Sequence, residues 1–250
     1  MNAEKLYIST IAADAPELAR RHGLGLEIAE YCTACNMDEG FAENDAAVRE
    51  KLAGVARRTL HAPFSELFPC AVDPRARELA RERYAQAMAL AVGYGARKLI
   101  IHGGFNPYLY FPEWYTAQSA PFWREFMGDV PQGLEICLEN VTEPAPELLC
   151  EIIAAVDDPR LKMCLDVGHA NAYSKISPMK WLERCAPFIG HFHIHNNQGD
   201  WDTHAALDKG GIPMAELLAA AERLCPEATL ALEVMEARSS VDWLESIGAI

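Results

Sequence analysis

The sequence lacks the features that mark membrane, exported and multidomain proteins. No apolar run approaches the roughly 18–20 residues that a membrane span needs. The first residues, MNAEKLYISTIAADAPELARR, do not combine a basic stretch, an apolar core and a cleavage site. No low-complexity tract or Pro-, Gly- or Ser-rich linker divides the chain. We therefore expect one domain, residues 1–250, in the cytoplasm and not in a membrane.

Basic residues are scarce, since 22 Lys and Arg stand against 36 Asp and Glu, for a formal net charge of −14. This charge repels polyanions at long range, so avid nonspecific binding to nucleic acid is disfavoured. Eight cysteines in a chain with no export signal are expected to be reduced thiols. Cys32 and Cys35 form a single CxxC motif, which favours a structural role over a zinc or redox site.

What the sequence does contain is a repeated unit, in which a short aliphatic or β-branched run precedes a segment with helical spacing. Eight such runs begin near residues 5, 24, 58, 97, 134, 161, 190 and 229, about 32 residues apart. The clearest helical segment is DPRARELARERYAQAMALAVGYG, residues 73–95. Eight βα units in 250 residues predict a closed (β/α)8 TIM barrel. An open doubly wound sheet is disfavoured because no Gly-rich dinucleotide motif follows the first run.

Four of the eight histidines lie within residues 190–204, GHFHIHNNQGDWDTH. His191, His193 and His195 alternate with Phe192 and Ile194. Alternate residues of a barrel strand point to the axis and to the helices, so the imidazoles are expected inside the barrel. They should rise towards the carboxyl end of the barrel, where such folds carry their active sites.

Other predicted strands also end in imidazole or carboxylate groups. Together with those of the seventh strand and its loop, the candidates are His61, His102, Glu139, Asp166, His169, His193, Asp202, His204 and Glu233. Any one of them alone would more often be structural. Several carboxylates that converge on one axis would repel one another unless a cation neutralised them. The set predicts a divalent metal centre, with Zn²⁺ or Mn²⁺ favoured and Co²⁺ or Mg²⁺ also open.

The ordered motifs HAPF, IHGG, LEN, CLDVGH, HIHNN, DTH and LEV, between about residues 5 and 240, resemble those of the xylose isomerase-like barrel superfamily. This superfamily includes sugar and sugar-phosphate isomerases and epimerases, and AP endonucleases of the endonuclease IV type (AP endonuclease family 2). The resemblance implies one divalent site with four ligands: Glu139, Asp166, His193 and Glu233. It also implies that Glu139 and Glu233 are the catalytic base and acid.

The same resemblance implies further metal ligands of the endonuclease IV type. His61 and His102 match the histidines that hold another metal with the bridging Glu139. His169, Asp202 and His204 match the third-metal set of that group. Two functions therefore stay open: an isomerase or epimerase that acts through an enediolate, or a phosphoesterase with a multinuclear zinc site.

Departures from the endonuclease pattern favour a small sugar or sugar phosphate as substrate. The chain reads ENVTE and CLDVGHA where the nucleases resemble ENTAG and CLDTCHA, and few basic residues flank the strand ends. Residues expected to contact the substrate are His169, His195, Phe105, Trp201 and Arg238. The aromatic segment FNPYLYFPEWYTAQSAPFW, residues 105–123, is expected to form a lid, a packed loop or a subunit contact. A homo-oligomer is also expected, because related epimerases are often dimers or tetramers.

Glu27 and Glu30 of the second predicted strand are additional candidates for the mouth of the barrel. An equally strong interpretation of Glu30 is a solvated surface carboxylate.

Overall fold

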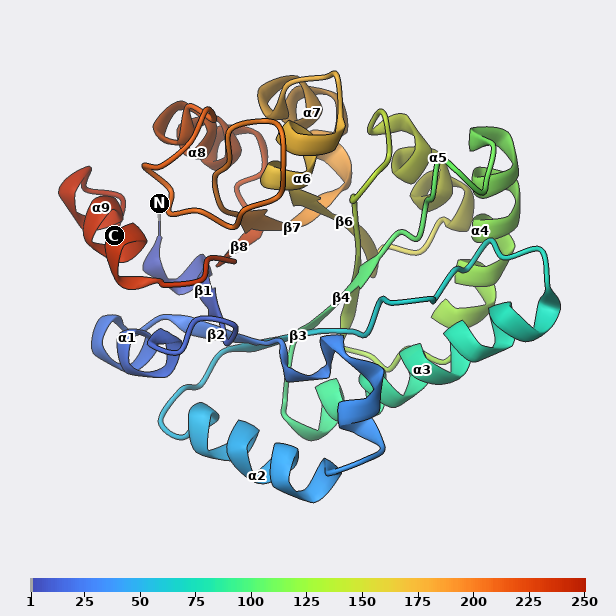
Figure 1. Ribbon diagram of the computed structural model, residues 1–250, viewed down its shortest axis with the longest axis horizontal. Coiled ribbons are helices and arrows are strands. Elements are labelled where there is room, and N and C mark those ends of the chain that lie inside the picture. The colour runs from blue at the N-terminus through green and yellow to red at the C-terminus, as the bar shows by residue number, and fades with distance from the viewer. Residues whose placement is uncertain (1) are drawn as a thin grey trace.

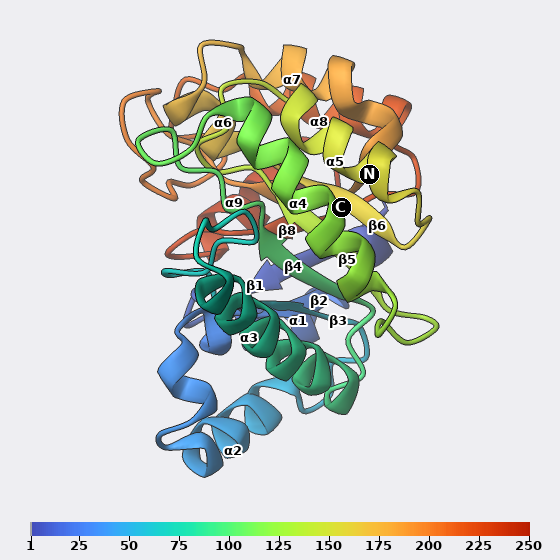
Figure 2. The same ribbon diagram turned by 90° about the vertical axis from the view of Figure 1, so that its right-hand side faces the viewer.

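Eight parallel strands close into a barrel in sequence order, and the helices surround it (Figures 1 and 2). The computed structural model describes residues 2–250. The first strand pairs with both the second and the eighth, which closes the sheet. The strands are β1 (Leu6–Ser9), β2 (Gly25–Ile28), β3 (Arg58–His61), β4 (Lys98–His102), β5 (Glu135–Glu139), β6 (Leu161–Asp166), β7 (Ile189–Ile194) and β8 (Thr229–Leu232). Each predicted start lies within one residue of an observed one, so the predicted (β/α)8 fold is confirmed.

Helices follow the strands and cover the outside of the barrel (Figure 1). The α-helices are α1 (Ala15–His22), α2 (Phe41–Leu52), α3 (Pro74–Gly93), α4 (Pro112–Met127), α5 (Glu147–Val156), α6 (Val167–Tyr173), α7 (Pro178–Cys185), α8 (Met214–Leu224) and α9 (Arg238–Ser246). Short 3-10 helices are η1 (Ala3–Lys5), η2 (Glu30–Cys32), η3 (Ala34–Met37) and η4 (Ala186–Phe188). Within residues 2–250, no helix is both long and apolar enough to cross a bilayer.

Local sequence signals explain where several helices begin. Helix α3 starts at Pro74 after Asp73, whose carboxylate accepts a hydrogen bond from the Arg75 N–H. Helix α7 starts in the same way, with Ser177 before Pro178. In α6 the capping residue is Asp166, which accepts from the His169 N–H at 2.6 Å. The end of β6 is thus tied directly to the helix that follows it.

The aromatic-rich segment 105–123 differs from the expected lid or packed loop, because its second half forms most of α4. Tyr115, Trp123 and Phe126 on this helix are buried in the hydrophobic core. The exposed rings lie in the first part of the segment and at the start of α4, where Tyr108 is 95%, Phe111 80% and Trp114 38% exposed. The buried rings of α4 therefore pack this helix against the hydrophobic core.

Apolar residues fill the space between strands and helices, whereas the inside of the barrel is mostly polar. Phe192 and Ile194 belong to the large outer core, as the alternation in β7 predicts. A separate small apolar cluster contains Ile100, Cys137 and Cys164. The residues before and after each of them on the same strand belong to the outer core. The other buried polar strand residues include glutamates, histidines and threonines. All eight cysteines are free thiols.

Candidate metal centre

Four side chains from β5 to β8 converge at the carboxyl end of the barrel. Glu139, Asp166, His193 and Glu233 each offer a ligand atom, and these atoms all lie within 4.8 Å of one another. His193 Nδ1 is 3.2 Å from Glu139 Oε1, 3.0 Å from Glu233 Oε2 and 3.8 Å from Asp166 Oδ2. The parallel register places Asp166 beside His193, so residues distant in sequence reach the same height. We call this group the metal cage.

Unpartnered polar atoms in the metal cage fit a divalent cation. Glu139 Oε1, His193 Nδ1 and Glu233 Oε2 are buried and have no hydrogen-bond partner. Buried polar atoms are nearly always partnered, and carboxylates this close repel one another unless a positive charge lies between them. One imidazole and three carboxylates also form a suitable donor set for Zn²⁺ or Mn²⁺. The residues present therefore fit such an ion.

Two further histidines face the other oxygen of Glu139. His61 Nε2 lies 3.0 Å and His102 Nε2 lies 3.5 Å from Glu139 Oε2. His61 Nδ1 donates to the Ala62 carbonyl at 2.8 Å, and since a carbonyl can only accept, the proton sits on Nδ1. The Phe64 ring stacks on His102 with centroids 4.2 Å apart. The structure thus brings both predicted histidines to Glu139.

His169, Asp202 and His204 form another group of three, with one ligand atom from each within 4.8 Å of the others. Asp202 Oδ2 is 3.2 Å from His169 Nε2 and 2.9 Å from His204 Nε2. Backbone carbonyls of Asn140 and Glu233 accept from the Nδ1 atoms of His169 and His204, at 2.9 and 2.7 Å. Both imidazoles therefore present Nε2 to Asp202, and carbonyl-fixed tautomers of this kind are typical of metal ligands.

Electrostatics keep the carboxyl groups ionised. Burial opposes ionisation of Glu139, but the charge of His193 and hydrogen bonding to His169 outweigh it and hold the pKa of Glu139 well below its ordinary value. The same balance, burial against the charge of His193, lowers the pKa of Glu233 to about 2. For His204 burial lowers the pKa, yet hydrogen bonding to Asp202 raises it to about 9. His193 and His204, whose pKa values are both raised, would therefore release protons on binding a cation.

Comparisons with known proteins agree with this architecture. A family model described as a xylose isomerase-like TIM barrel matches residues 16–247. The chain belongs to this family. The uncharacterised protein MJ1311 of Methanocaldococcus jannaschii is 28% identical over 198 residues, 73% of this chain and 66% of that protein, so the match spans slightly less than two thirds of this relative.

Two solved structures resemble the barrel over almost its whole length. One is described as a D-tagatose 3-epimerase-like protein, with a TM-score of 0.77, 24% identity and coverage of 98% of this chain and 96% of that one. The other is the TTHB071 protein from Thermus thermophilus soaked with ZnCl2, with a TM-score of 0.77, 26% identity and 98% coverage of both chains. The xylose isomerase-like fold is thus supported by sequence and by structure.

In this xylose isomerase-like barrel the three histidines of β7 have three different surroundings. His193 belongs to the metal cage, whereas His195 lies above it, with Nε2 3.1 Å from both oxygens of Asp166. The His195 ring also stacks on His204, with centroids 4.2 Å apart. His191 lies deeper, where its Nδ1 is 2.6 Å from Thr229 Oγ1. The alternation predicted their common side but not these separate partners.

The other residues predicted to contact substrate, Phe105, Trp201 and Arg238, differ in their exposure and in their partners. Phe105 is buried, packs against Tyr115 and lines a cavity of about 270 Å³ that also includes His102. Trp201, in the loop after β7, is 67% exposed. Arg238 directs its guanidinium to Glu17 at 3.1 Å. Phe105 thus adjoins a cavity shared with His102, while Arg238 is engaged by a carboxylate of α1.

Sequence reasoning placed Glu27 and Glu30 near the mouth, and the structure separates the two. Glu30 contacts Lys51 at 2.6 Å and accepts from the Thr10 hydroxyl at 2.8 Å, so it forms a partly buried ion pair. Glu27 is fully buried inside the barrel and contacts His193 from below. The sequence pattern that indicates an inward-facing Glu27 is its place between two apolar residues of the same strand, Leu26 and Ile28.

Proposed function

We propose that this protein is a divalent-metal-dependent sugar or sugar-phosphate isomerase or epimerase. The observation that carries the proposal is the metal cage, in which two buried glutamates, Glu139 and Glu233, approach His193 Nδ1 to 3.2 and 3.0 Å. The resemblance of the fold to a D-tagatose 3-epimerase-like protein supports the same class of substrate. Membership of the xylose isomerase-like family also supports it.

Four residues, Glu139, Asp166, His193 and Glu233, would hold the ion, with Zn²⁺ or Mn²⁺ favoured by the donor set. When bound, the ion supplies Lewis acidity towards a sugar carbonyl and its neighbouring hydroxyl. One glutamate, as a carboxylate, would take the proton from the carbon beside the carbonyl, and the other, as the neutral acid, would donate a proton to the enediolate carbon. Proton exchange with solvent would then restore both glutamates. His169 and His195, which border the cage, position substrate hydroxyl groups. Burial of the cage excludes water from the exchanging proton.

Proton exchange tests this proposal directly. The metal-loaded protein is incubated with a panel of ketoses and their phosphates in D₂O, and deuterium at the carbon beside the carbonyl is measured by NMR. We expect incorporation with at least one sugar, and none with metal-free protein. Failure of every sugar to exchange, with metal confirmed in the sample, contradicts the proposal.

A second candidate function, hydrolysis of a phosphoester, is favoured by one specific observation. His169, Asp202 and His204 are arranged as a further ligand set, and His61 and His102 both face Glu139. Several zinc ions held this way could activate water and neutralise phosphoryl oxygens. Metal analysis of protein purified without added metal distinguishes the two. Close to three zinc ions per chain, together with cleavage of an abasic-site oligonucleotide, would favour the hydrolase, whereas one manganese or cobalt ion favours the isomerase.

A further inference from the structure

Beneath the metal cage lies a buried carboxylate to which the proposed reaction assigns no role. Glu27 of β2 is fully buried. Its Oε2 is hydrogen-bonded to His191 Nε2 at 3.1 Å. Its Oε1 is 2.8 Å from His193 Nε2, and both of these atoms are buried and have no other partner. The hydroxyl of Thr59, its neighbour in the β2–β3 register, donates to Oε2 at 2.9 Å. Three groups from three other positions of the barrel wall therefore meet at one side chain.

We propose that Glu27 is a positioning residue of the metal centre: it holds His193 in the orientation and tautomer that present the Nδ1 lone pair to the ion. The proposal rests on the metal centre described above and on no particular sugar or reaction. Its physical basis is that an ionised carboxylate only accepts hydrogen bonds. A neutral His193 beside it therefore carries its proton on Nε2, and Nδ1 is left free towards Glu139 and Glu233.

The contacts on His191 support this role, because they fix Glu27 itself. His191 faces Glu27 through Nε2 and Thr229 through Nδ1. With the proton on Nε2, the Nδ1 atom accepts from the Thr229 hydroxyl. Glu27 is thus held on one side by His191 and Thr59, and its other oxygen remains for His193. A chain of contacts joins Thr229 of β8 to the cage through two imidazoles and one carboxylate.

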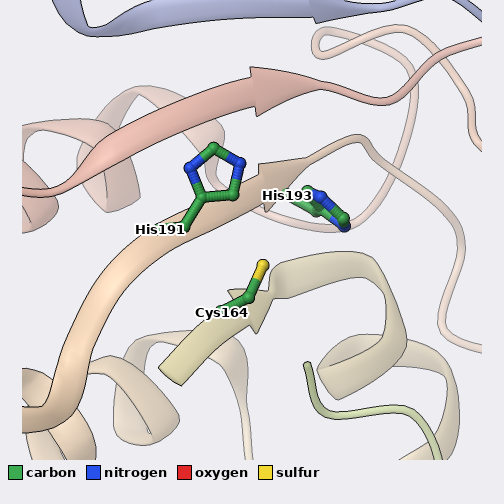
Figure 3. A group of neighbouring side chains, drawn as sticks. All are labelled: Cys164, His191 and His193. Carbon is green, nitrogen blue, oxygen red and sulfur yellow. The ribbon is translucent and has the colours of Figure 1, made fainter. Parts of the chain in front are cut away.

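An alternative role for the same region is a separate metal site. Cys164, His191 and His193 offer three atoms within 4.8 Å of one another, and their side chains point into the same space (Figure 3). His193 Nδ1 faces the metal cage, and His193 Nε2 lies 2.8 Å from Glu27 Oε1, so a carboxylate or the cage already stands beside each nitrogen. A second ion there would have to displace Glu27 from both imidazoles. The geometry therefore favours a carboxylate that orients ligands over a second bound cation.

Metal affinity in a matched pair of variants tests the role of Glu27. Glu27→Gln keeps the shape of the side chain but removes its charge. Glu143→Gln is the control, since Glu143 is equally buried and contacts Tyr115 and Val141 instead of the cage. Zn²⁺ affinity is measured by competition with a chromogenic chelator, and folding is checked by circular dichroism. We expect Glu27→Gln to weaken binding by roughly 10- to 100-fold, the usual effect of losing such a partner, and Glu143→Gln to leave it unchanged.

A tautomer measurement on the wild-type protein keeps the test independent of how the variant folds. In the zinc-loaded protein, ¹⁵N NMR of His193 should show a protonated Nε2 and a metal-bound Nδ1. Ligation through Nε2 would overturn the proposal, as would unchanged affinity in Glu27→Gln. A sulfur-to-metal charge-transfer band on titration with Co²⁺ would also overturn it, in favour of a site at Cys164.

These outcomes are distinguishable from failure of the proposed function. Wild-type protein that binds Zn²⁺ but exchanges no sugar proton overturns the isomerase alone, and the Glu27 comparison stands. Wild-type protein that binds no divalent ion overturns both.

Discussion

A Cβ atom on Gly168 would stand 1.9 Å from Cε1 of His195, so only glycine fits beneath this imidazole. The His195 ring also stacks on the ring of His204, with centroids 4.2 Å apart. Its Nε2 reaches both oxygens of Asp166. The glycine near the start of α6 therefore sets how closely the upper part of the site can approach the metal cage.

Replacement of Gly168 by alanine should disturb this contact. We expect Gly168→Ala to lower the free energy of unfolding by about 1–3 kcal/mol, a usual cost of an overpacked buried site, and to shift His195. Urea unfolding measures the first effect and histidine NMR the second. Gly211→Ala is the control, because a Cβ atom there would meet only Asn197 O at 3.7 Å. Equal stability of the two variants would contradict the packing argument.

The two proposed acid–base residues can be tested by removing their charge. Glu139→Gln and Glu233→Gln should each reduce proton exchange by at least about a hundredfold, the lower range for loss of a general acid or base. Deuterium incorporation at saturating metal measures the effect, and metal content is determined for each variant. Glu143→Gln serves as the buried control. Full activity in either cage variant would remove that residue from the catalytic role.

Glu143 predicts a pH-dependent stability that is separate from the cage. Burial raises the pKa of Glu143 from 4.5 to about 7, although the Val141 N–H and the Tyr115 hydroxyl donate to it. A raised pKa means that the folded state favours the neutral acid. The contribution of Glu143 to stability is therefore fully present below about pH 4.5, decreases as the pH rises towards 7 and is constant above that.

Relative to Glu143→Gln, the wild-type protein should lose about 3 kcal/mol of unfolding free energy across this pH range, because one pKa unit corresponds to about 1.4 kcal/mol. Urea unfolding of both proteins on either side of the range measures the difference. A wild-type and variant pair with parallel pH profiles would show that Glu143 titrates normally.

Metal binding should strengthen as the pH rises. Burial lowers the pKa of His204, but hydrogen bonding to Asp202 raises it to about 9, and the pKa of His193 is also held above its ordinary value, against burial, by nearby Cys164 and the glutamates. Ligand imidazoles must lose these protons before they bind a cation. We expect tighter apparent Zn²⁺ binding at roughly pH 8 than at pH 6, with proton release on loading. Chelator competition and pH-stat titration measure both, and affinity independent of pH would contradict the prediction.

The barrel and the metal cage were predictable because both depend on strand ends. The alternation in HFHIH identifies an inward face, and parallel strands bring their carboxyl ends to one rim. Residues as distant as Glu139 and Glu233 therefore had to meet once the strands were located. Helix α4 was harder to predict, because Pro112 and Pro121 and its many aromatic rings obscure the helical period.

Side-chain partners inside the barrel could not be predicted from the alternation. His191, His193 and His195 are equivalent in the pattern, yet they contact Thr229, the metal cage and Asp166 respectively. Their heights depend on the stagger of the strands, which includes a register shift between Met163 and Cys164. The sequence also does not predict the direction of a long surface side chain. Arg238 was expected to contact substrate, but it pairs with Glu17.

Alternate positions of each strand have different roles. One set faces the apolar core outside the barrel, and the other set faces its polar interior. Side chains that hold the molecule together, such as Phe192, lie on the opposite side of the sheet from those that set its chemistry, such as His193. Selection could thus remodel the reaction by exchanging inward groups while the outer layer keeps the chain folded. One scaffold of this construction can accommodate many substrates over evolutionary time.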